Sequence, residues 1–228
     1  MWNLPPPPGF QGLREDLPLH VYTRHMPHWR QNGATYFVTF RLADSLPQAK
    51  LRELKQMRQE WERKNPPPYE NEALQQLARS LAERTESWLD QGMGSCVLKD
   101  AALAAFVTQA MHFFDGDRYE LGAYVVMPNH VHAILRPIQW EEHPLEAILG
   151  SWKQFSSNHI NRRIGWHGPL WQDESYDRIN RDEPHLDTCL QYLGFNPEKA
   201  GLVRASCPVW VRPEWIKLGW IIRELEKM

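Results

Sequence analysis

The segment from Tyr124 to Leu135 constrains the fold more than any other part of the chain. It has a run of β-branched and aromatic residues, a Pro-Asn turn, and a second run that begins with two histidines one residue apart. Such runs on either side of a short turn predict two paired strands. Side chains alternate between the faces of a strand, so His130 and His132 project from the same face. Two imidazoles on one face provide half of a divalent metal site, although histidines that only pack in a core are commoner.

Hydrophobic spacing and turn residues predict the other elements. A strand is expected over 33–42, where β-branched and aromatic side chains are concentrated. This order of elements predicts an α+β fold, an antiparallel sheet with helices on one face. The open face of such a sheet would be a platform for a single nucleic-acid strand. The remaining expected elements are a short edge strand over 95–98, paired strands over 118–127 and 130–137, and helices over 48–64, 71–90, 101–114, 145–163 and 181–195.

A chain of 228 residues is suited to one generous domain. We expect a proline-rich N-terminal arm over 1–30, a main domain over 31–208 and a C-terminal helix over 209–228. The two helices over 48–90 form a helical-hairpin insertion in the main domain. The arm contains His20, His25 and His28, and their irregular spacing favours solvated histidines over a metal site.

Composition excludes several classes of protein. No stretch is long and apolar enough to span a bilayer, and the N-terminus lacks the pattern of a secretory signal. Cys96, Cys189 and Cys207 are widely spaced, which predicts free thiols in a reducing cytoplasm. The net charge is −2, whereas proteins that coat nucleic acid are usually strongly basic. Any DNA binding must therefore depend on a local patch and a metal ion.

A second candidate site lies near the end of the last predicted helix of the main domain. Tyr192 and Asn196 are four residues apart, so they share a helix face. The amide oxygen of Asn196 is a suitable ligand for Mg²⁺ or Mn²⁺, and Tyr192 would then lie beside the metal. On spacing alone, the preferred interpretation is that Tyr192 is a core tyrosine and Asn196 a helix C-cap before Pro197.

Four blocks of the sequence, taken in order, resemble one family. The chain is similar to the REP-associated tyrosine transposases, single-tyrosine members of the HUH endonuclease superfamily, over about residues 25–205. The blocks are Tyr36 to Arg41, Val126 to His132, Leu170 to Gln172, and Tyr192 to Val203.

The resemblance implies a fold and a reaction. The family has an antiparallel palm sheet, ferredoxin-like or RRM-like, flanked by helices. His130 and His132 match its metal-binding pair, Tyr192 matches its nucleophile, and Asn196 matches the residue that completes the metal site. The family cleaves single-stranded DNA near imperfect hairpins. Its tyrosine forms a 5′-phosphotyrosine and releases a free 3′-hydroxyl, and a second transesterification can rejoin strands.

The resemblance also implies a divalent metal cofactor, Mg²⁺ or Mn²⁺, and a hairpin-bearing single-stranded DNA partner. It implies a monomer or a homodimer in the cytoplasm, associated with the nucleoid. Two further hypotheses are a domesticated hairpin-binding protein with little cleavage, and a hydrolase in which a metal-activated water replaces Tyr192. Candidate DNA contacts, each also explicable as an ordinary surface residue, are Lys153, Arg162, Arg163, Arg178 and Lys199.

Overall fold

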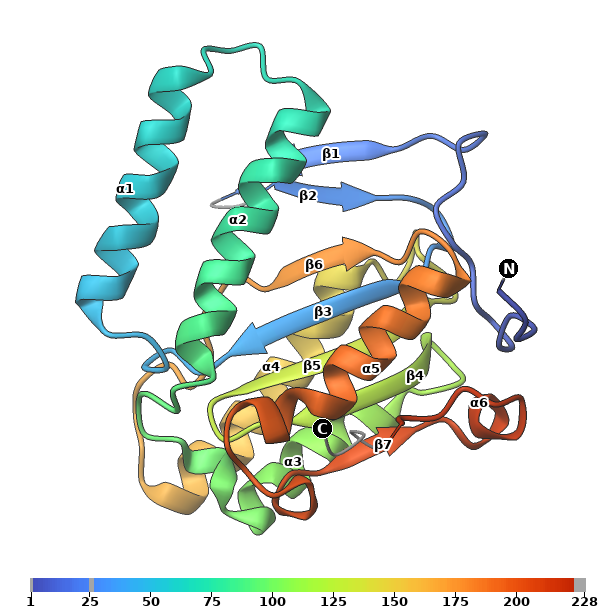
Figure 1. Ribbon diagram of the computed structural model, residues 1–228. Helices are drawn as coiled ribbons and strands as arrows, with labels where there is room; N and C mark the ends of the chain where they lie inside the picture. Colours follow the sequence, from blue (N-terminus) through green and yellow to red (C-terminus); the bar gives the residue numbers. More distant parts are fainter. Residues whose placement is uncertain (1, 25–26, 224–228) are drawn as a thin grey trace.

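In residues 2–24 and 27–223, which the computed structural model describes, the centre of the molecule is a five-stranded antiparallel sheet (Figure 1). Its strand order is β6–β3–β5–β4–β7. This confirms the predicted α+β class and the three long strands of the prediction. The strands are β3 (Tyr36–Arg41), β4 (Tyr119–Val126), β5 (His130–Pro137), β6 (Tyr176–Ile179) and β7 (Val209–Val211).

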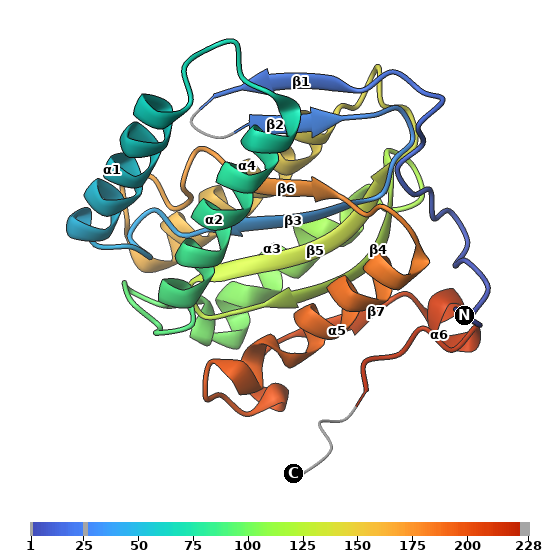
Figure 2. The same cartoon turned by 45° about the horizontal axis from the view of Figure 1, so that its top comes forward.

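Helices cover both faces of this sheet. One face packs against α3 (Ala101–Phe113) and α4 (Leu145–Ile164), and the other lies under α5 (Glu183–Lys199) and α2 (Asn71–Leu89) (Figures 1 and 2). The prediction of helices on one face only is therefore wrong. The physical reason is the central strand β5, in which every side chain except Arg136 is buried. The first core includes Tyr36, Val38, Phe40, Leu103, Trp152 and Ile160, and the second includes Phe37, Ile134, Leu186, Leu190 and Leu193.

The hairpin between β4 and β5 is held from outside the sheet. Its turn is closed by the backbone N–H of Met127, which donates to the carbonyl of His130 at 2.8 Å. The side-chain amide of Asn129 donates to the carbonyls of Leu89 and Met93, at 3.3 and 3.0 Å. Because these bonds use the amide nitrogen, the amide oxygen of Asn129 is left facing His130. The end of α2 therefore fixes the beginning of β5.

The predicted helical hairpin consists of α1 (Gln48–Lys64) and α2. Its inner helix α2 buries an apolar stripe that includes Leu74, Leu81 and Trp88, whereas no residue of α1 is fully buried. The figures show α1 outermost and α2 crossing the ends of β3 and β6 (Figures 1 and 2). The insertion therefore lies against the sheet face that bears the two histidines.

Two predicted segments in the first hundred residues differ from the structure. The arm over 1–30 contains two paired strands, β1 (His20–Thr23) and β2 (Pro27–Arg30). Residues 95–98 form no edge strand, because Cys96 adopts a left-handed backbone (φ 50°) and a single 3₁₀ turn, η1 (Val97–Lys99), follows.

The C-terminal region also differs from its prediction. The expected helix over 209–228 is wrong, because β7 pairs with β4 and only α6 (Pro213–Lys217) is helical in its described part. Residues 209–211 therefore form an edge strand of the central sheet. Residues 224–228 lie outside the described residues. A short 3₁₀ turn, η2 (Arg204–Ser206), precedes β7.

Two expectations from composition agree with the structure. Cys96, Cys189 and Cys207 are free and buried. Among the described helices, none combines the length and the hydropathy that a membrane crossing requires.

Candidate metal and nucleophile site

His130 and His132 lie on the sheet face beneath α2 and α5, and both are fully buried. In the pairing of β3 with β5, Arg41 is directly opposite His130 and Thr39 is directly opposite His132. These four side chains therefore share one face of the sheet, as the two-residue repeat predicted.

Both imidazoles direct an unprotonated nitrogen at the same point. The Nδ1 atom of His130 lies 2.8 Å from the amide oxygen of Asn129, which can only accept, so this Nδ1 carries the proton. Thr39 donates its hydroxyl proton to Glu86 and lies 2.8 Å from Nδ1 of His132, which therefore donates to Thr39. The two Nε2 atoms are left with their lone pairs, 3.0 Å apart.

Burial lowers the pKa of each histidine to about 3, so both are neutral at pH 7. Two lone pairs that face each other without a proton between them repel. A cation shared by the two nitrogens removes this repulsion, and neutral imidazole is the form that binds metals.

Asn196 approaches the same point from α5. Its amide oxygen lies 3.3 Å from Nε2 of His130, and its buried amide nitrogen has no hydrogen-bond partner among the described residues. Asn196 is inside α5, which continues to Lys199 through Pro197, so the alternative role as a C-cap is excluded. The cap residue is Ala200.

Tyr192 lies one turn earlier on the same face of α5 and is half-buried. Its ring packs edge-on against His132 and Phe37, with centroid distances of 5.4 and 5.9 Å. Its hydroxyl donates to Oε2 of Glu86 at 2.6 Å. Burial and the neighbouring Glu86 carboxylate raise the pKa of Tyr192 well above its usual value of about 10. The phenol is therefore protonated at pH 7.

Glu86, on α2, is the residue that the sequence analysis missed. Its Oε2 atom also lies 3.5 Å from Nε2 of His132. One ligand atom from each of Glu86, His130 and His132 lies within 4.8 Å of the other two. A sequence signal did exist: Glu86 is an acidic residue between the buried Ala82 and Leu89, which lie four residues before it and three after it on one helix face.

These residues suit a divalent metal. Two neutral imidazoles, a carboxylate and an amide oxygen form a mixed nitrogen and oxygen set of the kind that Mn²⁺ and Mg²⁺ accept. The facing lone pairs of the two histidines indicate that the set is incomplete without a bound cation. The Glu86–His130–His132 cluster can therefore hold a metal ion.

The predicted DNA contacts fall into two groups. Arg178 and Lys199 lie on the site side of the sheet: the Arg178 guanidinium is 4.9 Å from the Phe37 ring centre, and the Lys199 ammonium is 5.2 Å from that of Tyr192. Lys199 is paired with Asp90 at 2.7 Å. The other three, Lys153, Arg162 and Arg163, are on α4, in the opposite layer.

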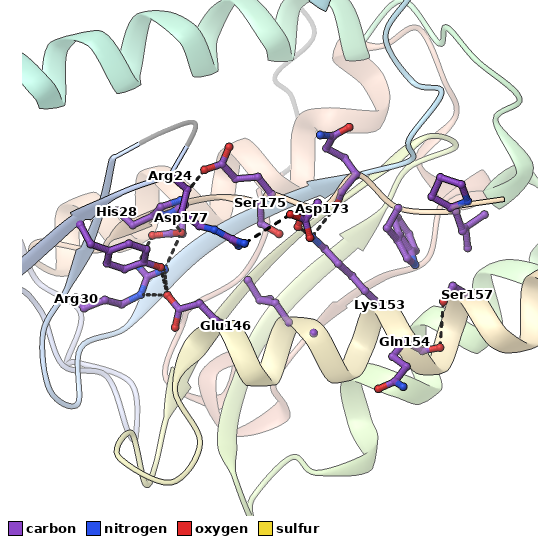
Figure 3. A pocket seen from close by; sticks show the side chains of 18 residues that line it. Arg24, His28, Arg30, Glu146, Lys153, Gln154, Ser157, Asp173, Ser175 and Asp177 are labelled. Carbon is purple, nitrogen blue, oxygen red and sulfur yellow. Dashed lines mark hydrogen bonds and ion pairs between the residues drawn. The ribbon is translucent and has the colours of Figure 1, made fainter.

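Lys153 borders a cavity of about 420 Å³ between α4 and the edge strand β6. Figure 3 shows His28 and Arg30 around Asp177 in this cavity. His28 is buried, contrary to the prediction of a solvated side chain, and its ring nitrogens lie 2.6 Å from Asp177 and 3.0 Å from Glu174. His25 lies outside the described residues. Lys153 donates to the backbone carbonyls of Gln172 and Asp173.

The charged cluster around Asp177 predicts a loss of stability in alkali. Burial alone would lower the pKa of His28, but the hydrogen bonds to Asp177 and Glu174 raise it to about 9. The folded protein therefore binds a proton that the unfolded chain releases near pH 6.5. We expect the free energy of unfolding to fall by up to about 3 kcal/mol between about pH 6.5 and 9. Urea denaturation measured across this pH range tests the prediction. In His28→Gln the free energy of unfolding is expected to change much less with pH. An equally steep pH dependence for that variant would contradict the assignment.

No protein-family model and no curated protein matches the chain. Among solved structures, the fold is similar to that of a REP-associated tyrosine transposase bound to a REP hairpin, at 16% sequence identity and a TM-score of 0.39. The similarity covers 80% of this chain and 75% of that one.

Proposed function

We propose that this protein is a metal-dependent single-stranded DNA endonuclease and strand transferase that cleaves beside a DNA hairpin. The observation that carries the proposal is the convergence of Tyr192 with the facing histidines. Residues from β5, α2 and α5 meet around one point, and the hydroxyl of Tyr192 lies at its edge. The choice of a hairpin substrate rests on the sequence resemblance.

Each side chain then has a role. His130, His132, Asn196 and Glu86 would hold the metal ion. When bound, Mg²⁺ or Mn²⁺ polarises the scissile phosphate and stabilises the charge that develops during attack. The packing of Tyr192 against His132 and Phe37 fixes the direction of its hydroxyl.

The covalent step is a transesterification. The oxygen of Tyr192 forms a bond to phosphorus, the bond from phosphorus to the 3′ oxygen breaks, and the released strand end becomes a 3′-hydroxyl. The phenolic proton leaves along the hydrogen bond to Glu86, which is 2.6 Å away. The departing 3′ oxygen takes up one proton from water, which balances the proton that the phenol loses. Attack by a 3′-hydroxyl on the phosphotyrosine reverses the step and rejoins strands, so no nucleotide cofactor is required.

A covalent-adduct assay tests the proposal. The protein is mixed with labelled single-stranded hairpin DNA from beside its own gene and with Mn²⁺, then separated on a denaturing gel. We expect a shifted band that disappears when EDTA is present. DNA binding on a native gel without any covalent band would instead favour a hairpin-binding protein that does not cleave.

A further inference from the structure

Two grooves lie beside the metal site, on the same side of the sheet. The first has a volume of about 590 Å³ and lies between the α1–α2 hairpin and the strands β3 and β6. The second, of about 370 Å³, lies between α2, β6 and α5. Tyr176 of β6 is the residue that lines both grooves.

Strand pairing places Tyr176 in line with the metal site. Tyr176 is directly opposite Thr39, and Thr39 is directly opposite His132. Two strand spacings, about 10 Å in total, therefore separate Tyr176 from the metal ligand. Arg41 and Arg178 project from the same face on either side of this row, since Arg41 is opposite His130 and Arg178 is opposite Phe37.

Most of the lysine and arginine side chains that line the grooves are not neutralised by the protein. Within residues 2–24 and 27–223, five of these side chains form no ion pair. They are Arg41 and Lys55 in the first groove, and Arg79, Arg178 and Arg181 in the second.

The carboxylates of the grooves, in contrast, have partners. Asp177 is bonded to His28 and Arg30, Glu174 to His28, and Glu62 is paired with Arg58. A strongly positive local surface therefore exists on a chain whose net charge is −2.

Arg41 and Arg178 are partly buried despite the absence of a counter-charge. Burial lowers the pKa of Arg41 to about 10. Its guanidinium donates to two uncharged groups, the Ser45 hydroxyl at 3.1 Å and the Leu42 carbonyl at 3.4 Å, and no carboxylate among the described residues pairs with it. The Nε atom of Arg178 is buried and has no hydrogen-bond partner among the described residues. Such groups cost stability, and a bound anion would supply the missing partner.

We propose that the two grooves hold the single-stranded segment of the DNA substrate that continues from the scissile phosphate. Arg41 and Arg178 each bind a backbone phosphate, and a base between them stacks on Tyr176. Unpaired cations on both sides of an aromatic ring are the usual means of binding a single strand without reading its sequence. This assignment rests on the proposed function, because it identifies the strand as the substrate of the Tyr192 site.

The assignment gives the α1–α2 hairpin a function. Lys55 on α1 and Arg79 on α2 extend the cationic lining to the side of the grooves away from the sheet. The insertion therefore forms one wall of a channel, and the sheet face forms the other wall. The DNA strand lies between the sheet and the α1–α2 hairpin.

Binding of a short oligothymidine tests the inference without cleavage. Fluorescence anisotropy is measured on the full chain in EDTA, at several salt concentrations. We expect Arg41→Gln and Arg178→Gln each to weaken binding about fivefold or more and to lower the salt slope by about 0.7. Tyr176→Leu should weaken binding about tenfold and leave the slope unchanged, because it removes stacking and no charge.

Arg118→Gln is the matched control. Arg118 forms no ion pair in the described residues and precedes β4 at the end of the sheet far from His130, so its loss should change neither affinity nor slope. Lys55→Gln, at an exposed position of α1, is a second groove variant with little risk to folding. If the groove variants bind like Arg118→Gln, or if the wild-type protein does not bind the oligothymidine, the inference is wrong.

The adduct assay separates this inference from the proposed function. Groove-dependent binding without a Tyr192 adduct would refute the proposed function and leave the grooves as a strand-binding site. A Tyr192 adduct, together with unchanged oligothymidine binding by all groove variants, would refute only the proposal that the grooves hold the DNA strand.

Discussion

Tyr192→Phe is expected to abolish the covalent DNA adduct, with a loss of at least about a thousandfold in the rate of strand cleavage. The substitution removes one oxygen atom, which is the proposed nucleophile, and leaves the ring that packs on His132 and Phe37. A single-turnover cleavage assay with Mn²⁺ measures the rate, and a denaturing gel measures the adduct.

Two companion measurements make this result specific. Mn²⁺ binding, followed by electron paramagnetic resonance, should persist in Tyr192→Phe, because the phenol is not among the proposed ligands. Binding of the hairpin DNA should persist as well. Cleavage at the wild-type rate would show that a metal-activated water is the nucleophile and that Tyr192 only packs.

The elements that position the histidine pair were predictable from sequence because their signals are local. His130 and His132 come directly after a turn, and the residues next to them in the strand, Val131 and Ala133, are apolar. Both the strand and the shared face of the two histidines therefore follow from a two-residue repeat. Tyr192 and Asn196 are likewise related by one helical turn. What these rules could not supply was the distance between the two pairs, which depends on how α5 packs on the sheet.

Glu86 could not be assigned for the same reason. Its position between the buried Ala82 and Leu89 places it on the inner side of α2, but only the packing of α2 brings it to Tyr192, 106 positions later in the chain. Tertiary packing also decides the layer of each helix. Lys153, Arg162 and Arg163 were predicted as DNA contacts, but no local pattern shows that α4 lies on the sheet face opposite the histidines.

The C-terminal error has a local cause. A helix was predicted over 209–228, yet Val209, Trp210 and Val211 are β-branched or aromatic and lie between Pro208 and Pro213. Prolines at both ends of so short a segment favour a strand at a sheet edge over a continuous helix. The segment pairs with β4 in the structure, as this composition would have indicated.

Glu86→Gln is expected to weaken Mn²⁺ binding by at least about tenfold. The substitution keeps the size of the side chain and an oxygen that can accept from Tyr192, but it removes the negative charge beside the two neutral histidines. A Mn²⁺ titration without DNA measures the affinity directly. Glu83→Gln is the matched control, because Glu83 is exposed, lies one turn earlier on α2 and changes the charge equally. Equal affinities for the two variants would show that Glu86 only accepts the hydrogen bond from Tyr192.

A metal ligand on α2 also couples the hairpin to the metal site. His130 and His132 come from the sheet and Asn196 from α5, so Glu86 would be the ligand that the insertion contributes. A ligand that binds the folded, docked arrangement stabilises it by an amount that grows with the logarithm of the ligand concentration relative to its dissociation constant. Mn²⁺ should therefore slow amide hydrogen exchange along α2 in the wild-type protein and much less in Glu86→Gln. If exchange along α2 slows equally in both proteins, the metal does not bind through Glu86, and the hairpin is held against the sheet by its apolar stripe alone.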